Sequence, residues 1–86
     1  MTNTLAADAT DVAALSTAHT LAMARSDIHS AVNADTDHRR HQYALSARDH
    51  AVTVLLERTS EPSQREHAEY YLADAEAIIA ATTPIS

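Results

Sequence analysis

Six histidines in an 86-residue chain without cysteine are the side chains best suited to bind a metal or move a proton. His38 and His41 are three residues apart, a spacing that places two imidazoles on one face of a helix. Asp37 precedes His41 by four residues, and His29 falls near the same end if the first two helices form a hairpin. Three imidazoles with one carboxylate suit zinc or another borderline metal ion. A metal-binding protein or metalloenzyme subunit that uses these four residues is one interpretation.

The spacings that established helical sites use are missing, however. The chain has no His-Glu-x-x-His sequence and no pair of Glu-x-x-His segments, and Asp35-x-x-His38 is a single weak analogue. It also has no glycine for a phosphate-binding loop. His19, His50 and Tyr71 fall at similar heights in the predicted bundle, where they either form a buried polar cluster that fixes the helix register or coincide by the layout of three helices alone. We therefore favour an interpretation with no catalytic residue, no cofactor and no metal.

Helices alone are expected to position these side chains. Glycine and cysteine are absent, only two prolines occur, and the sequence is rich in alanine, the strongest helix former. The length allows one domain over residues 1–86. We predict an all-α fold, a small antiparallel three-helix bundle or helical layer completed by oligomerisation. The predicted helices span about 10–32, 36–59 and 63–81, between a frayed N-terminus and a short C-terminal tail.

Two short polar segments separate the predicted helices. Asn33 suits the end of the first helix, and the acidic segment that follows it suits the start of the second. Pro62 cannot continue the central helix, and Ser63-x-x-Glu66 has the pattern of a capping box. We therefore expect the third helix to begin near Ser63, and the short connections make neighbouring helices antiparallel.

The first and third helices each carry one stripe that is expected to face the core. In the first helix the stripe consists mainly of small residues: Ala14, Ala18, Leu21, Ala22, Arg25, Ile28 and Val32. In the third helix it contains larger ones: Ala68, Tyr71, Leu72, Ala75, Ile78 and Ile79.

The central helix differs because it has apolar residues on two separated faces. One is a seam with alternating steps of three and four: His38, His41, Leu45, Arg48, Val52, Leu55 or Leu56, and Thr59. The other is flatter, and its alanines would let another helix approach closely: Tyr43, Ala47, His50, Ala51 and Val54. A surface helix normally has one apolar stripe, so both faces of this helix need cover.

The core is expected to be thin. The chain has no Phe, no Trp and no cysteine for a disulfide, and small single-core domains supply only about 3–5 kcal/mol of net stability. We therefore predict a two-fold homodimer, in which a second copy covers one face of the central helix. The predicted interface includes residues from Leu45, Val52, Leu55 and Leu56, or else from Tyr43, Ala47 and Val54 on the flat face, with Val12 and Met23 as further candidates. The alternative is a flat layer in which the outer helices cover both faces within one chain.

The net charge of −6 argues against a nucleic-acid partner. All six basic residues are arginines, and they alternate with acids instead of forming the basic patch that phosphate backbones require. The third helix is acidic, and Glu66 and Glu69 are candidates for docking a basic protein. The alternative is a solvated face without a partner.

The first residues lack the basic start and apolar run of a signal peptide, and no apolar stretch approaches the roughly 18 residues of a membrane span. We therefore expect a cytoplasmic protein by default. Together these observations favour a non-catalytic protein–protein interaction module, an acidic helical subunit that self-associates and docks a protein partner. The histidine-based metal protein is the alternative.

Overall fold

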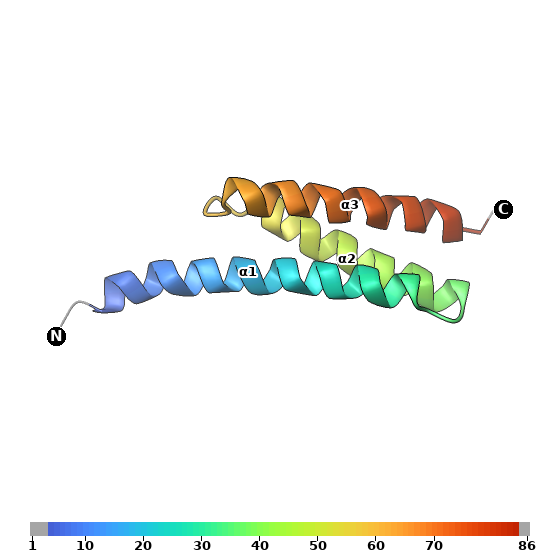
Figure 1. Ribbon diagram of the computed structural model, residues 1–86, viewed down its shortest axis with the longest axis horizontal. Coiled ribbons are helices and arrows are strands. Elements are labelled where there is room, and N and C mark those ends of the chain that lie inside the picture. The colour runs from blue at the N-terminus through green and yellow to red at the C-terminus, as the bar shows by residue number, and fades with distance from the viewer. Residues whose placement is uncertain (1–3, 85–86) are drawn as a thin grey trace.

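The described part of the chain folds into the helices α1 (Thr4–Val32), α2 (Asp37–Leu56) and α3 (Pro62–Thr82), which lie side by side in Figure 1. The computed structural model describes the backbone of residues 4–84 and the side chains of residues 16–84, and no strand occurs in that range. α2 runs back along α1, and α3 reverses again, so α1 and α3 point the same way. The all-α prediction is confirmed. Across the described helices, none combines the length and apolarity that crossing a bilayer requires.

Small side chains form the centre of the bundle. Val54 is the largest fully buried side chain among the described residues, and every other buried apolar residue is an alanine: Ala24, Ala31, Ala44, Ala47, Ala51, Ala68 and Ala75. Alanine at the contact lines lets helix backbones approach closely. Leu21, Leu55 and Leu72 pack against this core but remain half-buried. The structure therefore buries little of its large apolar surface, as the sequence predicted.

Both faces of α2 receive cover from the same chain. Ser46 and His50 contact Asp27 of α1, whereas His41 contacts Thr82 of α3. α1 and α3 also touch each other, but less extensively than each touches α2. The arrangement is a three-helix bundle whose two shorter dimensions, 21 and 19 Å, are nearly equal, so the flat layer is not what forms. The flat alanine face of α2 lies in the core, and the seam lies along α3.

The buried stripe of α1 is displaced from the predicted one. Thr17, Ala24 and Ala31 are buried at intervals of seven residues, while Arg25 and Val32 are exposed. Close helix packing selects the smallest side chains for the contact line, and larger neighbours flank it. Ala14 has no described side chain.

Several helix ends differ from the predicted ones. α1 begins at Thr4, earlier than the predicted start, and residues 1–3 and 85–86 lie outside the described part. α2 ends at Leu56 instead of Thr59. Just beyond this end, the buried Ser60 hydroxyl donates a hydrogen bond to the Val54 carbonyl at 2.6 Å. α3 begins at Pro62, whose missing N–H suits the first helical position.

The predicted capping box at Ser63 and Glu66 is therefore wrong. Glu61 is the N-cap of α3, and the Gln64 side chain accepts a hydrogen bond from the Glu61 backbone N–H at 2.8 Å. Starting the helix at Pro62 moves the reciprocal pair two residues toward the N-terminus, because the third helical residue is then Gln64. At the start of α2, Thr36 caps the helix as expected.

An arginine holds the connection between α1 and α2. Arg40, in the first turn of α2, donates through Nε to the Ala31 carbonyl at 3.2 Å and through Nη2 to the Ala34 carbonyl at 2.7 Å. Its Nη1 also pairs with Asp37 at 2.7 Å. The carbonyls at the C-terminus of a helix lack intrahelical partners and carry partial negative charge. One guanidinium therefore satisfies the end of α1 and fixes the start of α2.

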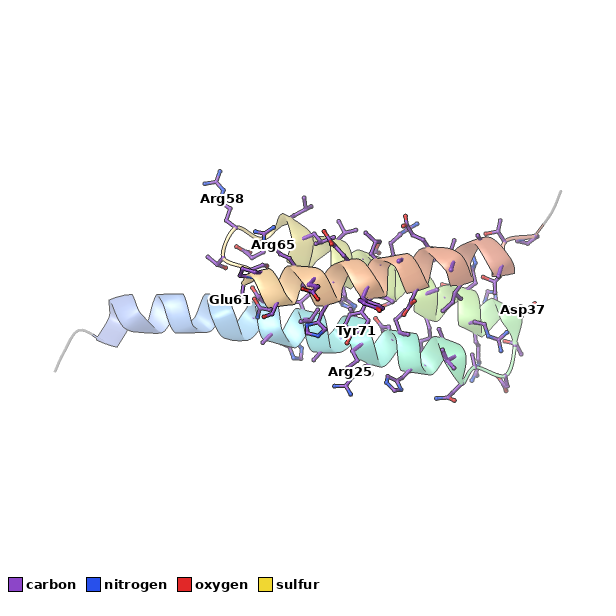
Figure 2. The ribbon with its side chains drawn as sticks, turned by 45° about the horizontal axis from the view of Figure 1, so that its top comes forward. Arg25, Asp37, Arg58, Glu61, Arg65 and Tyr71 are labelled. Atoms are coloured by element: carbon purple, nitrogen blue, oxygen red, sulfur yellow. The ribbon has the colours of Figure 1, made fainter. Side chains whose placement is uncertain are left out.

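A second arginine repeats this arrangement at the next connection. Arg65 is also the fourth residue of its helix, and it donates to the carbonyls of Leu55 at 3.0 Å, Glu57 at 2.9 Å and Ser60 at 3.3 Å. Figure 2 shows Arg65 beside this connection, whereas Arg58 points away from the bundle. A guanidinium offers several donors in a fixed plane, which a lysine ammonium does not. We call Arg40 and Arg65 the arginine clamps.

Candidate interaction surface

Four residues of the predicted interface lie on α2. Leu45, Val52 and Leu55 are half-buried on α2, and Leu56 is 78% exposed at the end of the helix. The seam is thus covered only in part. The exposed portion of Leu45, Val52 and Leu56 is the α2 patch, a surface of large apolar side chains on a protein whose core is alanine.

Two opposite charges lie in the middle of the α2 patch. Arg48 Nε and Asp49 Oδ1 are 3.6 Å apart, with side chains that are 42% and 75% exposed. Adjacent residues on a helix point in diverging directions, so this pair has poor geometry. Exposed ion pairs contribute about 0–1 kcal/mol even when the geometry is good. Both charges therefore remain available to other partners.

The predicted acidic surface lies on α3. Glu66 and Glu69 are exposed, as are Asp74 and Glu76. Among the described side chains, none of these four carboxylates makes an ion pair or a hydrogen bond. Tyr70, between Glu66 and Asp74 in the sequence, is 69% exposed. Glu66, Glu69 and Tyr70 form the α3 acidic face, and its charges are not compensated by the rest of the described chain.

A polar cluster joins α1 to α2. Asp27 Oδ2 accepts hydrogen bonds from Ser46 Oγ at 2.7 Å and from His50 Nδ1 at 2.8 Å. The Asp27 side chain is 14% exposed and that of His50 is 33% exposed. A carboxylate accepts only, so His50 donates to Asp27 through Nδ1. The Ser46 hydroxyl hydrogen is engaged by Asp27, so it does not form the Ser–His contact that activates a nucleophile.

This cluster differs from the predicted polar cluster of His19, His50 and Tyr71. His50 takes part, but His19 is exposed, and Tyr71 lies by a pocket between α1 and α3 that His67 also lines. The spacing of Ser46 and His50, four residues apart, was a visible signal in the sequence. Their partner Asp27 is on another helix, and only the register of the hairpin brings it opposite them. The cluster therefore fixes the register of α1 relative to α2.

Another histidine contact joins α2 to α3. The Thr82 hydroxyl donates to the Ile78 carbonyl at 2.7 Å, so it accepts from Nδ1 of His41 at 2.8 Å. Residues 81–84 line a surface pocket of about 430 Å³ together with Asp37, His38 and His41. The pocket brings together three of the four residues of the metal interpretation. His29 is exposed on α1 and is not among its lining residues.

The candidate metal ligands that line this pocket are not grouped around one position. Among the residues whose side chains are described, no three His, Cys, Asp or Glu residues are placed to hold one metal ion. The Asp37 carboxylate is also engaged by Arg40. His29, His38, His41 and Asp37 are thus not assembled into one site.

Comparisons with protein families, with curated proteins and with solved structures found no match to this chain.

Proposed function

We propose that this chain is a non-catalytic protein–protein interaction module that self-associates and docks a second protein. The observation that carries the proposal is the distribution of apolar side chains. Alanines and a single valine fill the core, while Leu45, Val52 and Leu56 remain wholly or partly at the surface. An exposed group of large apolar side chains is characteristic of a protein interaction site.

Self-association would add substantially to the stability of this bundle. Burying an exposed leucine or valine contributes about 1.5–3 kcal/mol, and a small single core supplies only about 3–5 kcal/mol in total. A symmetric dimer buries each side chain of the patch twice, once from each subunit. We therefore expect folding and association to be coupled.

The concentration dependence of thermal unfolding tests this part of the proposal. If the dimer is the folded form, the melting temperature rises as protein concentration increases. Replacing Val52 with Asp places a charge in the patch and should lower both the melting temperature and its concentration dependence. A melting temperature that stays constant from low to high micromolar concentration would rule out coupled self-association.

The α3 acidic face is the proposed surface for the second protein. Glu66 and Glu69 are exposed and unpaired among the described side chains, so a basic partner would find both charges free. Complementary charge raises the association rate and selects against acidic competitors. The interaction should weaken as salt concentration increases.

Partner capture from the native cell tests this surface with two baits. The wild-type chain should retain a basic protein that the variant Glu66→Lys/Glu69→Lys loses, while helix content stays the same. Asp35→Lys serves as a control, because Asp35 is exposed at the α1–α2 connection, away from this face. Equal retention by the two baits would remove the α3 acidic face from consideration.

A further inference from the structure

The N-terminal part of α1 extends beyond the other two described helices. α1 has 29 residues, whereas α2 has 20 and α3 has 21. At 1.5 Å per residue, α1 is therefore roughly 12–14 Å longer than either neighbour. We call its first nine residues, 4–12, the α1 extension, and Figure 1 shows them beyond the α2–α3 connection. A lone helix shorter than about 12–15 residues is marginal in water, so a partner that covers the extension would stabilise it.

One line of side chains along α1 is exposed wherever side chains are described. Residues seven apart in a helix are two turns apart, and the line through them drifts by only about 20°. Ala18, Arg25 and Val32 share such a line, and all three are exposed. Counting back by the same interval places Asp11 and Thr4 on this line in the α1 extension. We call these five positions the α1 line.

The α1 line becomes complementary to itself when α1 is reversed. Ala18 is the midpoint of α1, which runs from Thr4 to Val32. Asp11 lies seven residues before Ala18, and Arg25 lies seven residues after it. Two α1 helices that pack antiparallel about a two-fold axis at Ala18 therefore bring Asp11 of each copy level with Arg25 of the other. Because both residues lie on the same line as the axis, opposite charges meet, and this happens twice.

Arg25 is available for this contact. It is exposed, Figure 2 shows it pointing away from the bundle, and its side chain makes no hydrogen bond or ion pair with the described residues. Arg25 also lines a hollow of about 280 Å³ between α1 and α3, together with Ala18 and Tyr71. A helix that lies along the α1 line would cover this hollow and meet the guanidinium.

The charges of the α1 extension favour a reversed second copy as its occupant. Asp8 and Asp11 are its only charged residues. Two extensions placed side by side would therefore repel each other, and so would two parallel α1 helices in register. Reversal about Ala18 instead lays residues 4–12 of one copy along residues 24–32 of the other.

This reversal covers both extensions without bringing the two bundles together. Within each copy, α2 and α3 flank the C-terminal part of α1. In the antiparallel pair, the α2 and α3 helices of the two copies therefore lie toward opposite ends. Each α1 extension then lies beside the other copy's α1, in the part that carries Arg25.

We propose that a second copy of this chain docks on the α1 line, with the two α1 helices antiparallel and the two-fold axis at Ala18. This contact uses a different helix from the α2 patch, so it goes beyond the self-association proposed above. Alanine and exposed ion pairs contribute less than buried leucine and valine. The α1 contact should therefore be weaker than the α2 contact and join copies at concentrations above tens of micromolar.

Disulfide trapping locates the axis, because the chain contains no cysteine of its own. In Ala18→Cys, the two new thiols face each other across the axis, within the Cα separation of about 4.4–6.8 Å that a disulfide spans. Ala22→Cys is the matched control, because Ala22 is also an exposed alanine that lines the hollow. Reversal about Ala18 places its two thiols about eight residues apart along the helices, roughly 12 Å. Under mild oxidation, Ala18→Cys should form the covalent dimer at least about tenfold faster than Ala22→Cys.

Charge reversal in the Ala18→Cys background tests the ion pairs. Asp11→Arg places two arginines against each other at both contacts, and Arg25→Asp places two aspartates there. Each variant should form the covalent dimer about tenfold more slowly, since two ion pairs are replaced by repulsion. The double variant Asp11→Arg/Arg25→Asp should recover the original rate, because reversing both charges restores complementarity.

Matched controls separate the contact from the change in net charge. Asp35→Arg and Arg39→Asp change the net charge in the same two ways, at exposed positions near the α1–α2 connection. In the Ala18→Cys background, both should cross-link within about twofold of the unreversed chain. Circular dichroism should show equal helix content in all variants, so that a change in rate reports the contact and not the fold.

The outcomes separate this contact from the self-association through the α2 patch. Equal cross-linking rates for Ala18→Cys and Ala22→Cys contradict the axis at Ala18, whatever the mass of the wild-type chain. Fast cross-linking of Ala18→Cys that charge reversal leaves unchanged contradicts the pairing of Asp11 with Arg25. A wild-type chain that is monomeric at tens of micromolar, while Ala18→Cys still cross-links selectively at higher concentration, contradicts the α2 contact and supports the α1 contact.

Discussion

Replacing one arginine clamp with lysine should destabilise the fold far more than replacing the arginine beside it. Arg40 donates to two carbonyls at the end of α1, whereas the neighbouring Arg39 is exposed, and its side chain makes no hydrogen bond or ion pair with the described residues. Arg40→Lys and Arg39→Lys keep the charge, and the two residues have similar helix propensity. Comparing the stability of these two variants therefore measures how much the guanidinium geometry of Arg40 contributes.

The expected magnitude follows from the hydrogen bonds that lysine cannot make. A lysine ammonium can still pair with Asp37, but it cannot reach the Ala31 and Ala34 carbonyls together as the planar fork does. A hydrogen bond to a charged group contributes about 1.5–3 kcal/mol, and partial exposure favours the lower end. We expect Arg40→Lys to cost about 2 kcal/mol. For a domain of this size that corresponds to a fall of about 10 °C in melting temperature.

Thermal unfolding followed by circular dichroism at one protein concentration measures this difference. Arg39→Lys should melt within about 2 °C of wild type, because exposed substitutions usually change stability by less than about 0.5 kcal/mol. Arg65→Lys and the exposed Arg58→Lys repeat the comparison at the second connection. If Arg40→Lys melts no lower than Arg39→Lys, the clamp does not hold the connection and this reasoning is refuted.

Three further predictions concern the core, the polar cluster and the histidine pocket. Ala51→Leu should destabilise the fold by about 1–3 kcal/mol through overpacking of the core. Ala80→Leu, on the exposed side of α3, should change the midpoint of denaturant unfolding little. Equal effects of the two substitutions would contradict an alanine core. Asp27→Ala and His50→Ala should show a coupling energy of about 1 kcal/mol in a double-mutant cycle, and simple additivity would contradict the contact. Elemental analysis of the purified protein should find no stoichiometric transition metal. A bound metal that is lost when His38 and His41 are both replaced would restore the metal interpretation.

Much of the fold follows from local sequence properties. Helix propensity, the absence of glycine and the polar segments around residues 33–37 and 60–62 define three helices and their order. The alanine face of α2 was also predictable, because Ala47, Ala51 and Val54 share one side of the helix. Periodicity was less informative for α1, where alanines occur on nearly every side and several stripes fit equally well.

The contacts between helices could not be predicted in the same way. Arg40 and Arg65 each occupy the fourth position of a helix after a short connection, and each donates to backbone carbonyls. Because every residue has a backbone carbonyl, the sequence does not indicate which carbonyl accepts the hydrogen bond. Asp27 lies opposite His50 only because the α1–α2 connection sets a particular register. The exposed charges of the α2 patch were visible from the start. The partial exposure of Leu45, Val52 and Leu56 on the same side of α2 is known only from the structure.

Sedimentation equilibrium of the wild-type chain tests the central claim most directly, because it measures mass without assuming a shape. We predict that the mass rises with concentration toward twice the 9.3 kDa of one chain and reaches that value by tens of micromolar. The same experiment on Val52→Asp should give a mass close to that of one chain. A wild-type mass that stays at 9.3 kDa throughout this range would contradict self-association and identify the three-helix monomer as the functional form.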